Sequence, residues 1–249
     1  MSEQSRFRDF GFLSDAAYAN RASLKTDYSD SAQTVFERVR TCLNDLDQVK
    51  GACLDVGGVQ NGLLLWIRSI EASQGAIHLA DLGMPGTANS SLRTAFECLF
   101  YACALWRKPA LNTRLFQDYV GELQKMASKV LPISAEHNLD PETVDRMNAI
   151  VAEPKSKGEL SAHDAAEAAD LLGLYQTAYR GLSSHGAHAT WGSTGTFRNR
   201  VSPQGNLVVG PDFAQTELIW RGAHKCLRIG SERFKSDCLP QIVPPPTPK

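Results

Sequence analysis

The chain has 249 residues, of which 43% are hydrophobic and 21% charged, and its formal net charge is −1. This length is sufficient for one well-buried domain, and the composition is ordinary for a globular protein. The near-zero charge excludes a globally basic nucleic-acid-binding surface, so a nucleic acid would have to meet a local basic patch.

The cysteine spacing and the hydropathy of the chain indicate the cellular compartment in which the protein is expected. The six cysteines include no pair with the CxxC spacing of a zinc or redox site. The longest uninterrupted apolar run, 98–106, is too short to span a bilayer, and the N-terminal residues lack the apolar stretch of a signal peptide. We therefore expect a cytoplasmic protein without membrane association. His185-x2-His188 and His224-x-Cys226 lack third and fourth ligands, so we expect no metal and no other cofactor.

Apolar residues recur at helical spacing along most of the chain. Residues 1–29 are polar and aperiodic and are expected to form an N-terminal arm. Gly83 with Pro85, Asp140 with Pro141, and Ser161 are helix stop and start signals. The predicted helices run from Asp30 or Ser31 through Leu46, and over 58–82, 88–108, 109–130, 140–153 and 161–184.

The character of the sequence changes after Gly186. Two short alternating runs flank Pro203-Gln204-Gly205 within 190–211 and predict a β-hairpin. A last helix is expected over 212–235, followed by a Pro-rich tail, 239–249, whose last nine residues, 241–249, should not be helical. The predicted fold class is an all-α helical bundle with a small β-hairpin insertion before the last helix, in a single domain, 30–238.

Arg180 and His185 form the clearest chemical signal, an Arg-x4-His element. A histidine can transfer the protons of metal-independent RNA cleavage, and an arginine can hold the phosphate. On a regular helix these positions lie about 140° apart, so they converge only if the helix breaks or two chains combine. If the helix continues, Ser184 and His188 share a face with Arg180. The alternative is that Arg180 and His185 only cap a helix end.

Further polar residues accompany this element. Arg93 and Glu97 lie four apart on an apolar helix. They form either a local ion pair or a pair in which Glu97 orients a catalytic residue on another helix. Arg198 and Arg200, close to aromatic residues, could contact phosphate or be merely solubilising. A polar strip on the preceding helix could line a ligand-binding channel or be a solvated boundary; its residues are Glu71, Gln74 and His78.

The order of SLRTAFE and then YQTAYRGLSSHGAH resembles the bacterial domain of unknown function 5677, whose members look related to the HEPN superfamily of helical ribonucleases and toxins. The resemblance covers about 55–235. It implies an R-x(4–6)-H active site at Arg180 and His185, with Arg93 and Glu97 as the family-type residues on the earlier helix. It further implies a homodimer, no metal, and a role in defence or toxin–antitoxin systems.

We therefore predict a metal-independent endoribonuclease, with a possible antitoxin or other partner protein. Arg180, His185, Glu97 and Arg93 would be catalytic, and His188, Ser184, Arg198 and Arg200 would contact the RNA. Two alternatives remain open: a non-catalytic helical module that binds protein or RNA, and a small-ligand sensor that uses the polar strip.

Overall fold

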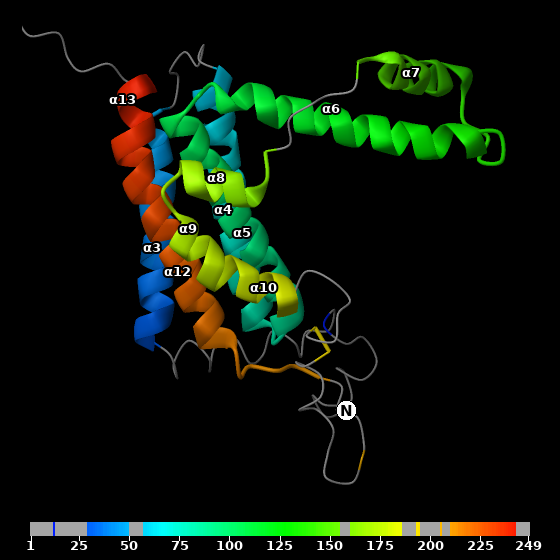
Figure 1. Cartoon of the computed structure of the whole chain (residues 1–249). Helices are drawn as coiled ribbons and strands as arrows, with labels where there is room; N and C mark the ends of the chain where they lie inside the picture. The colour runs from blue at the N-terminus through cyan, green and yellow to red at the C-terminus, as the bar shows by residue number, and fades with distance from the viewer. Residues whose placement is uncertain are drawn as a thin grey trace, which may run out of the picture.

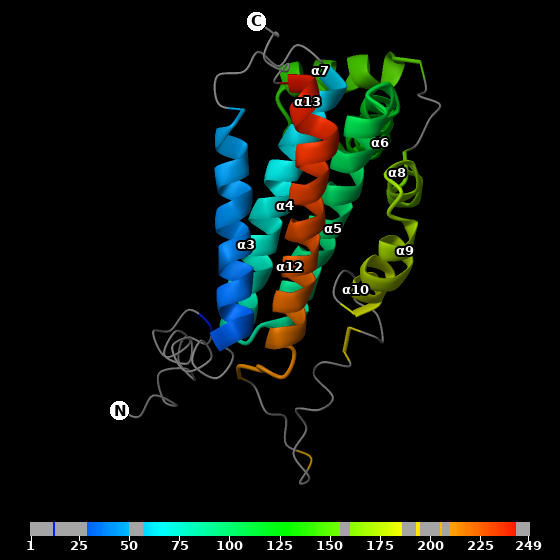
Figure 2. The ribbon, with the colours of Figure 1, turned by 90° about the vertical axis from the view of Figure 1, so that its left-hand side faces the viewer.

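Four long helices form the centre of the fold. The computed structural model describes residues 12, 29–49, 57–154, 160–185, 193–194, 205 and 210–242. Figures 1 and 2 show the four helices side by side with their axes roughly aligned. They are α3 (Ser29–Asp47), α4 (Gly57–Asp81), α5 (Pro85–Arg107) and α12 (Thr216–Arg233). Each corresponds to a predicted helix, so the expected helical bundle is confirmed.

The core of the bundle is aromatic. Trp66 of α4, Trp106 of α5 and Trp220 of α12 are at most 1% exposed, and burying each such side chain stabilises the fold by roughly 1.5–3 kcal/mol. Trp106 packs edge-on against Phe234, with ring centroids 6.0 Å apart. Helix α12 approaches α4 closely because Gly230 has no side chain; a Cβ there would lie 2.0 Å from Cζ3 of Trp66.

The turn between α4 and α5 follows the signals in the sequence. Gly83 has a φ of 73°, a left-handed conformation that glycine adopts without steric penalty. Pro85 is the first residue of α5, where its missing N–H would have had no helical partner. Helix α5 therefore begins before residue 88, where apolar spacing alone placed its start.

A helical hairpin projects from one end of the bundle (Figure 1). It consists of α6 (Leu111–Val130), the short 3₁₀ helix η2 (Leu131–Ile133) and α7 (Pro141–Ala152), and we call it the α6–α7 arm. The Asp140 side chain caps α7 by accepting a 2.8 Å hydrogen bond from the Thr143 N–H. Both helices lie where the sequence predicts them.

The prediction of a single helix over 161–184 is wrong. Ser161 does cap a helix, but α8 (Ala162–Ala168) is short. Asp170 has a φ of 59°, and the Leu171 N–H donates to the Ala166 carbonyl at 2.8 Å, a pattern that closes a helix. Aspartate tolerates the left-handed region better than most residues, and the spacing of apolar residues gave no sign of this break.

After the break the chain resumes along α5 (Figure 2). A single turn, α9 (Leu172–Leu174), leads into the π-helical turn η3 (Tyr175–Tyr179) and then α10 (Arg180–His185). In η3 the Arg180 N–H donates to the Tyr175 carbonyl, five residues back. Such π-turns frequently occur at functional sites, and this one lies directly before the Arg-x4-His element.

The last helix continues beyond its predicted end at 235. Helix α12 passes into the π-helical turn η4 (Phe234–Cys238) and then α13 (Leu239–Ile242). The prediction that residues 241–249 are non-helical is therefore wrong for the first two of them, which belong to α13. Gln241 holds the final turn against α5 by donating from Nε2 to the Trp106 carbonyl at 2.8 Å. Residues 243–249 lie outside the described residues, as do residues 1–11 and 13–28 of the expected N-terminal arm.

The predicted β-hairpin insertion is also wrong. The described part of the chain contains helices and no strand, so the fold class is all-α. Within 190–211 the structure describes residues 193–194, 205 and 210–211, of which 193–194 form a turn. An isolated pair of short strands is only marginally stable, so two alternating runs were insufficient grounds for a hairpin. None of the helices in the described ranges has the length and apolar character required to cross a membrane.

Candidate functional site

The Arg-x4-His element lies on α10. Arg180 is the first residue of this helix and is exposed. Ser184 is exposed too, and its Oγ donates to the Gly181 carbonyl at 2.9 Å. The backbone of α10 remains helical through position 185, so the helix break considered from the sequence does not occur. Positions 180 and 185 therefore lie about 140° apart around the axis, and one chain does not present both on the same face.

Part of the predicted site lies outside the described residues. This applies to the side chain of His185 and to His188, Arg198 and Arg200. The structure thus describes the site as α10 up to Ser184, together with the surface of α5 that supports it.

Arg93 of α5 is the centre of a side-chain network beneath α10. Its Nη1 donates to Glu97 Oε2 at 3.0 Å, so the local ion pair considered as an alternative is present. Its Nε donates to Ser183 Oγ at 2.9 Å and its Nη2 to the Tyr179 hydroxyl at 2.5 Å. The guanidinium carbon also lies 4.7 Å from the centre of the Tyr179 ring. One arginine therefore connects α5 to both η3 and α10.

Tyr179 completes this network. Burial, and then the neighbouring Glu97 charge, raise the pKa of its hydroxyl to about 12, so Tyr179 is protonated at neutral pH. The hydroxyl can accept from Arg93 and also donate to Glu97, a hydrogen bond that further raises the pKa. The Ser183 Oγ donates to the Tyr179 carbonyl at 2.9 Å. Because these hydrogen bonds connect α5 to η3 and α10, the network is suited to holding α10 in place.

Sequence reasoning identified Arg93 and Glu97 but missed Tyr179 and Ser183. The available signal was the spacing of Tyr175, Tyr179 and Ser183, which recur every four residues. The two tyrosine rings stack with centroids 5.1 Å apart. This spacing places the aromatic and hydroxyl groups on one helix face. That face could have been matched with Arg93, the half-buried arginine of the neighbouring helix α5.

A mostly apolar cavity of about 510 Å³ adjoins α10. It lies between α5, η3, α10 and α12, and Gly181 and Leu182 form part of its wall. At one side the Asn89 Nδ2 donates to the Gln215 Oε1 at 3.0 Å. Its lining includes no ionisable side chain, so the described wall offers packing and amide hydrogen bonds to an occupant.

The polar strip considered for ligand sensing lies on the outside of α4. Glu71, Gln74 and His78 are all exposed. Glu71 and Arg68 border a shallow hollow of about 440 Å³. The strip therefore lies along a solvated helix face, and only Glu71 of the three lines this hollow.

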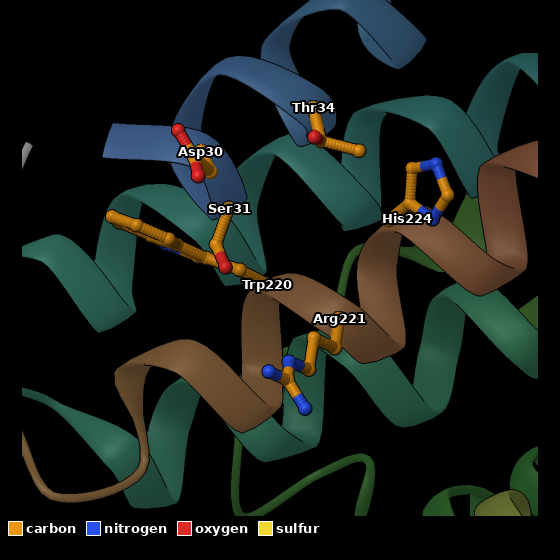
Figure 3. A pocket seen from close by; sticks show the side chains of 6 residues that line it. All are labelled: Asp30, Ser31, Thr34, Trp220, Arg221 and His224. Carbon is orange, nitrogen blue, oxygen red and sulfur yellow. The ribbon is translucent and has the colours of Figure 1, made fainter. Parts of the chain in front are cut away.

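A smaller hollow of about 260 Å³ lies between α3 and α12, and Figure 3 shows the side chains that line it. Arg221 pairs with Glu217 at 2.7 Å, and the same carboxylate accepts from Ser31. Partial burial, and then the charges of nearby arginines, lower the pKa of His224, so this imidazole is neutral at pH 7. Because both Asp30 and Arg221 line it, the hollow has no clear preference for an anion or a cation.

One group of side chains in the described ranges could approach a metal ion. Ligand atoms of His163, Asp164 and Glu167 on α8 lie within 4.8 Å of one another. Asp164 already serves the capping box at Ser161 and pairs with Arg114 at 3.3 Å. Because these groups are largely exposed and Asp164 has other partners, the arrangement is explained without an ion.

The described residues thus form an all-α bundle with an arginine-centred network beneath an exposed Arg180. The Family of unknown function (DUF5677) matches residues 62–205. This span is more than half of the chain and contains Arg93, Glu97 and α10, so the chain belongs to this family. None of the curated proteins and none of the solved structures matches the chain.

Proposed function

We propose that this chain is a HEPN-like, metal-independent endoribonuclease whose active site is completed between two copies. The observation that carries the proposal is the exposed Arg180 at the start of a helix that Arg93 anchors from below. The helical backbone separates positions 180 and 185 by about 140°. Arg180 of one chain would therefore act with His185 of the other, in the symmetric arrangement most common among soluble oligomers.

The chemistry assigns a different role to each residue. His185 would take the proton from the ribose 2′-hydroxyl or protonate the leaving 5′-oxygen. Arg180 would hold the phosphate and neutralise the charge that develops on it. Arg93 and Glu97 would act as positioning residues, because they form hydrogen bonds with other protein side chains. Ser184, His188, Arg198 and Arg200 are the candidates for further RNA contacts.

The test is cleavage of a labelled RNA in the presence of EDTA. The expected products carry 2′,3′-cyclic phosphate ends, and both Arg180→Ala and His185→Ala abolish cleavage. Arg146→Ala is the matched control, because Arg146 is an exposed arginine on a different helix, α7. Toxicity on expression that His185→Ala relieves would support a toxin or defence role.

Mixing the two inactive variants tests the shared site. A dimer of one Arg180→Ala chain and one His185→Ala chain retains one intact pair, Arg180 of the second chain with His185 of the first. Random mixing of symmetric dimers therefore restores about a quarter of the wild-type activity. Wild-type cleavage without any restoration on mixing contradicts the composite site.

A non-catalytic binding module is the second candidate. It is favoured by the separation of positions 180 and 185, which lie about 140° apart around one continuous helix. This candidate predicts no cleavage at any protein concentration, whereas Arg180→Ala weakens binding of RNA or of a partner protein.

A further inference from the structure

Helix α6 carries an apolar stripe that the rest of the described chain does not cover. Its residues recur in alternating steps of three and four, the spacing of a coiled-coil seam with Phe116 at an a position. Five of these residues lie on α6, namely Phe116, Tyr119, Leu123, Met126 and Val130, and the sixth, Ile133, lies in η2 directly after it.

Four side chains of this stripe are exposed, and Leu123 and Val130 are half-buried. Phe116 is 63% exposed, Tyr119 59%, Met126 55% and Ile133 39%. In the whole of α6 only Ala127 is buried. Exposed large apolar side chains that line up along one helix face are typical of an interaction surface.

Helix α7 covers a different face of α6. The Gln124 Nε2 donates to the carbonyls of Ile150 and Glu153, at 3.2 and 3.0 Å. Gln124 and the buried Ala127 therefore mark the side of α6 that faces α7, and the stripe lies beside it. Figure 1 shows the α6–α7 arm projecting away from the bundle, so a second helix has access to the stripe.

The charges that flank the stripe indicate what kind of helix fits it. Glu122 and Lys129 both occupy g positions, one heptad apart. When two copies of α6 pair antiparallel, g positions face each other, and Glu122 of each copy lies against Lys129 of the other. In a parallel pair g faces e, and Glu122 would meet Ala127 instead. The helix is therefore electrostatically complementary to an antiparallel copy of itself.

We infer that α6 is a dimerisation helix, which pairs antiparallel with α6 of a second copy of this chain. The stripe spans about 26 Å at the rise of an α-helix, and its centre lies between Leu123 and Met126. A two-fold axis there places Phe116 opposite Ile133 and Tyr119 opposite Val130. All six apolar side chains of each copy then become buried. Glu122, which contacts Lys125 at 2.7 Å in one chain, gains Lys129 of the second copy.

This inference does not rest on the proposed function, because it concerns the arm and not α10. It is tested by the mass of the full chain in solution, measured by sedimentation over a range of concentrations. The wild type is expected to form a dimer of twice the 27.2 kDa of one chain. Tyr119→Lys and Met126→Lys each weaken the dimer by about tenfold or more, since each places two charges in the seam.

Two controls make the outcome specific. Ser128→Lys adds the same charge on the exposed face opposite the seam and leaves the dimer intact. Unchanged circular dichroism of the Tyr119 and Met126 variants separates lost association from lost folding; both side chains are more than half exposed. A wild type that is monomeric at every concentration overturns the inference, as does a dimer that both lysine variants leave unchanged.

Charge reversal tests the orientation. Glu122→Lys and Lys129→Glu each weaken the antiparallel dimer, because each brings like charges together at two equivalent places, one on each side of the two-fold axis. The double variant restores the pairing. A dimer that depends on Met126 but is indifferent to both reversals overturns the antiparallel arrangement.

Discussion

Replacing Arg93 by methionine tests whether the network beneath α10 fixes that helix. Methionine retains much of the apolar stem but loses hydrogen bonds to three side chains, Glu97, Tyr179 and Ser183. A hydrogen bond to a charged group contributes ~1.5–3 kcal/mol to stability. The Arg93–Glu97 ion pair contributes less than this, because water screens the two side chains, which are 22% and 31% exposed. We expect the free energy of unfolding to fall by about 2–3 kcal/mol, since the nearly buried Tyr179 hydroxyl also loses its donor.

Urea unfolding measures this loss, and Arg146→Met is its matched control. Arg146 also pairs with a glutamate four residues away, but the two side chains are 69% and 79% exposed. Such a pair contributes only ~0.3–0.5 kcal/mol. Amide exchange adds the local measurement: exchange in α10 should accelerate in Arg93→Met and not in Arg146→Met, because α10 loses its attachment to α5. Equal stability of the two variants, or unchanged exchange in α10, would refute the positioning role.

Two further predictions concern Tyr179 and Gly230. Because the pKa of Tyr179 is raised from 10.0 to about 12 in the folded chain, the unfolded chain loses this proton first, and the free energy of unfolding decreases from pH 10 towards 12. Tyr179→Phe should flatten that decrease in urea titrations, and an unchanged pH dependence would contradict the assignment. Gly230→Ala places a Cβ 2.0 Å from the Trp66 ring and should destabilise the fold by roughly 1–3 kcal/mol. Gly121→Ala, with nothing within 4 Å, should instead stabilise α6 by about 0.5–1 kcal/mol; equal melting temperatures would contradict this account.

What the sequence predicted correctly depends on local chemistry. The turn at Gly83 and the cap at Asp140 require only residues within one helix turn of each other, so both could be identified from spacing. The break at Asp170 could not be identified in this way, because an aspartate in the left-handed region does not alter the spacing of the apolar residues. The hairpin prediction failed for the related reason that alternation over a few residues contains no information on whether a strand finds a partner.

In the candidate site, too, the sequence predicted only the contact between residues that are close together along the chain. The Arg93–Glu97 pair is four residues apart and was visible as a possibility in the sequence. Tyr179 and Ser183, which complete the network, are 86 and 90 residues from Arg93 along the chain. Only the packing of η3 and α10 against α5 brings them together. That packing depends on the break at Asp170, which ends α8 and redirects the chain along α5.

The composite nuclease site and the α6 dimer require different contacts with a second copy of the chain, and the Met126→Lys variant distinguishes them. A composite nuclease site needs α10 of two chains to meet, because one helix presents positions 180 and 185 about 140° apart. The α6 pairing needs only the arm. If Met126→Lys abolishes both the dimer and RNA cleavage, the arm brings the two active-site helices together. If cleavage persists in a Met126→Lys dimer, α10 lies at a second interface. If a Met126→Lys monomer cleaves RNA, the composite site is wrong, and another residue must act beside Arg180.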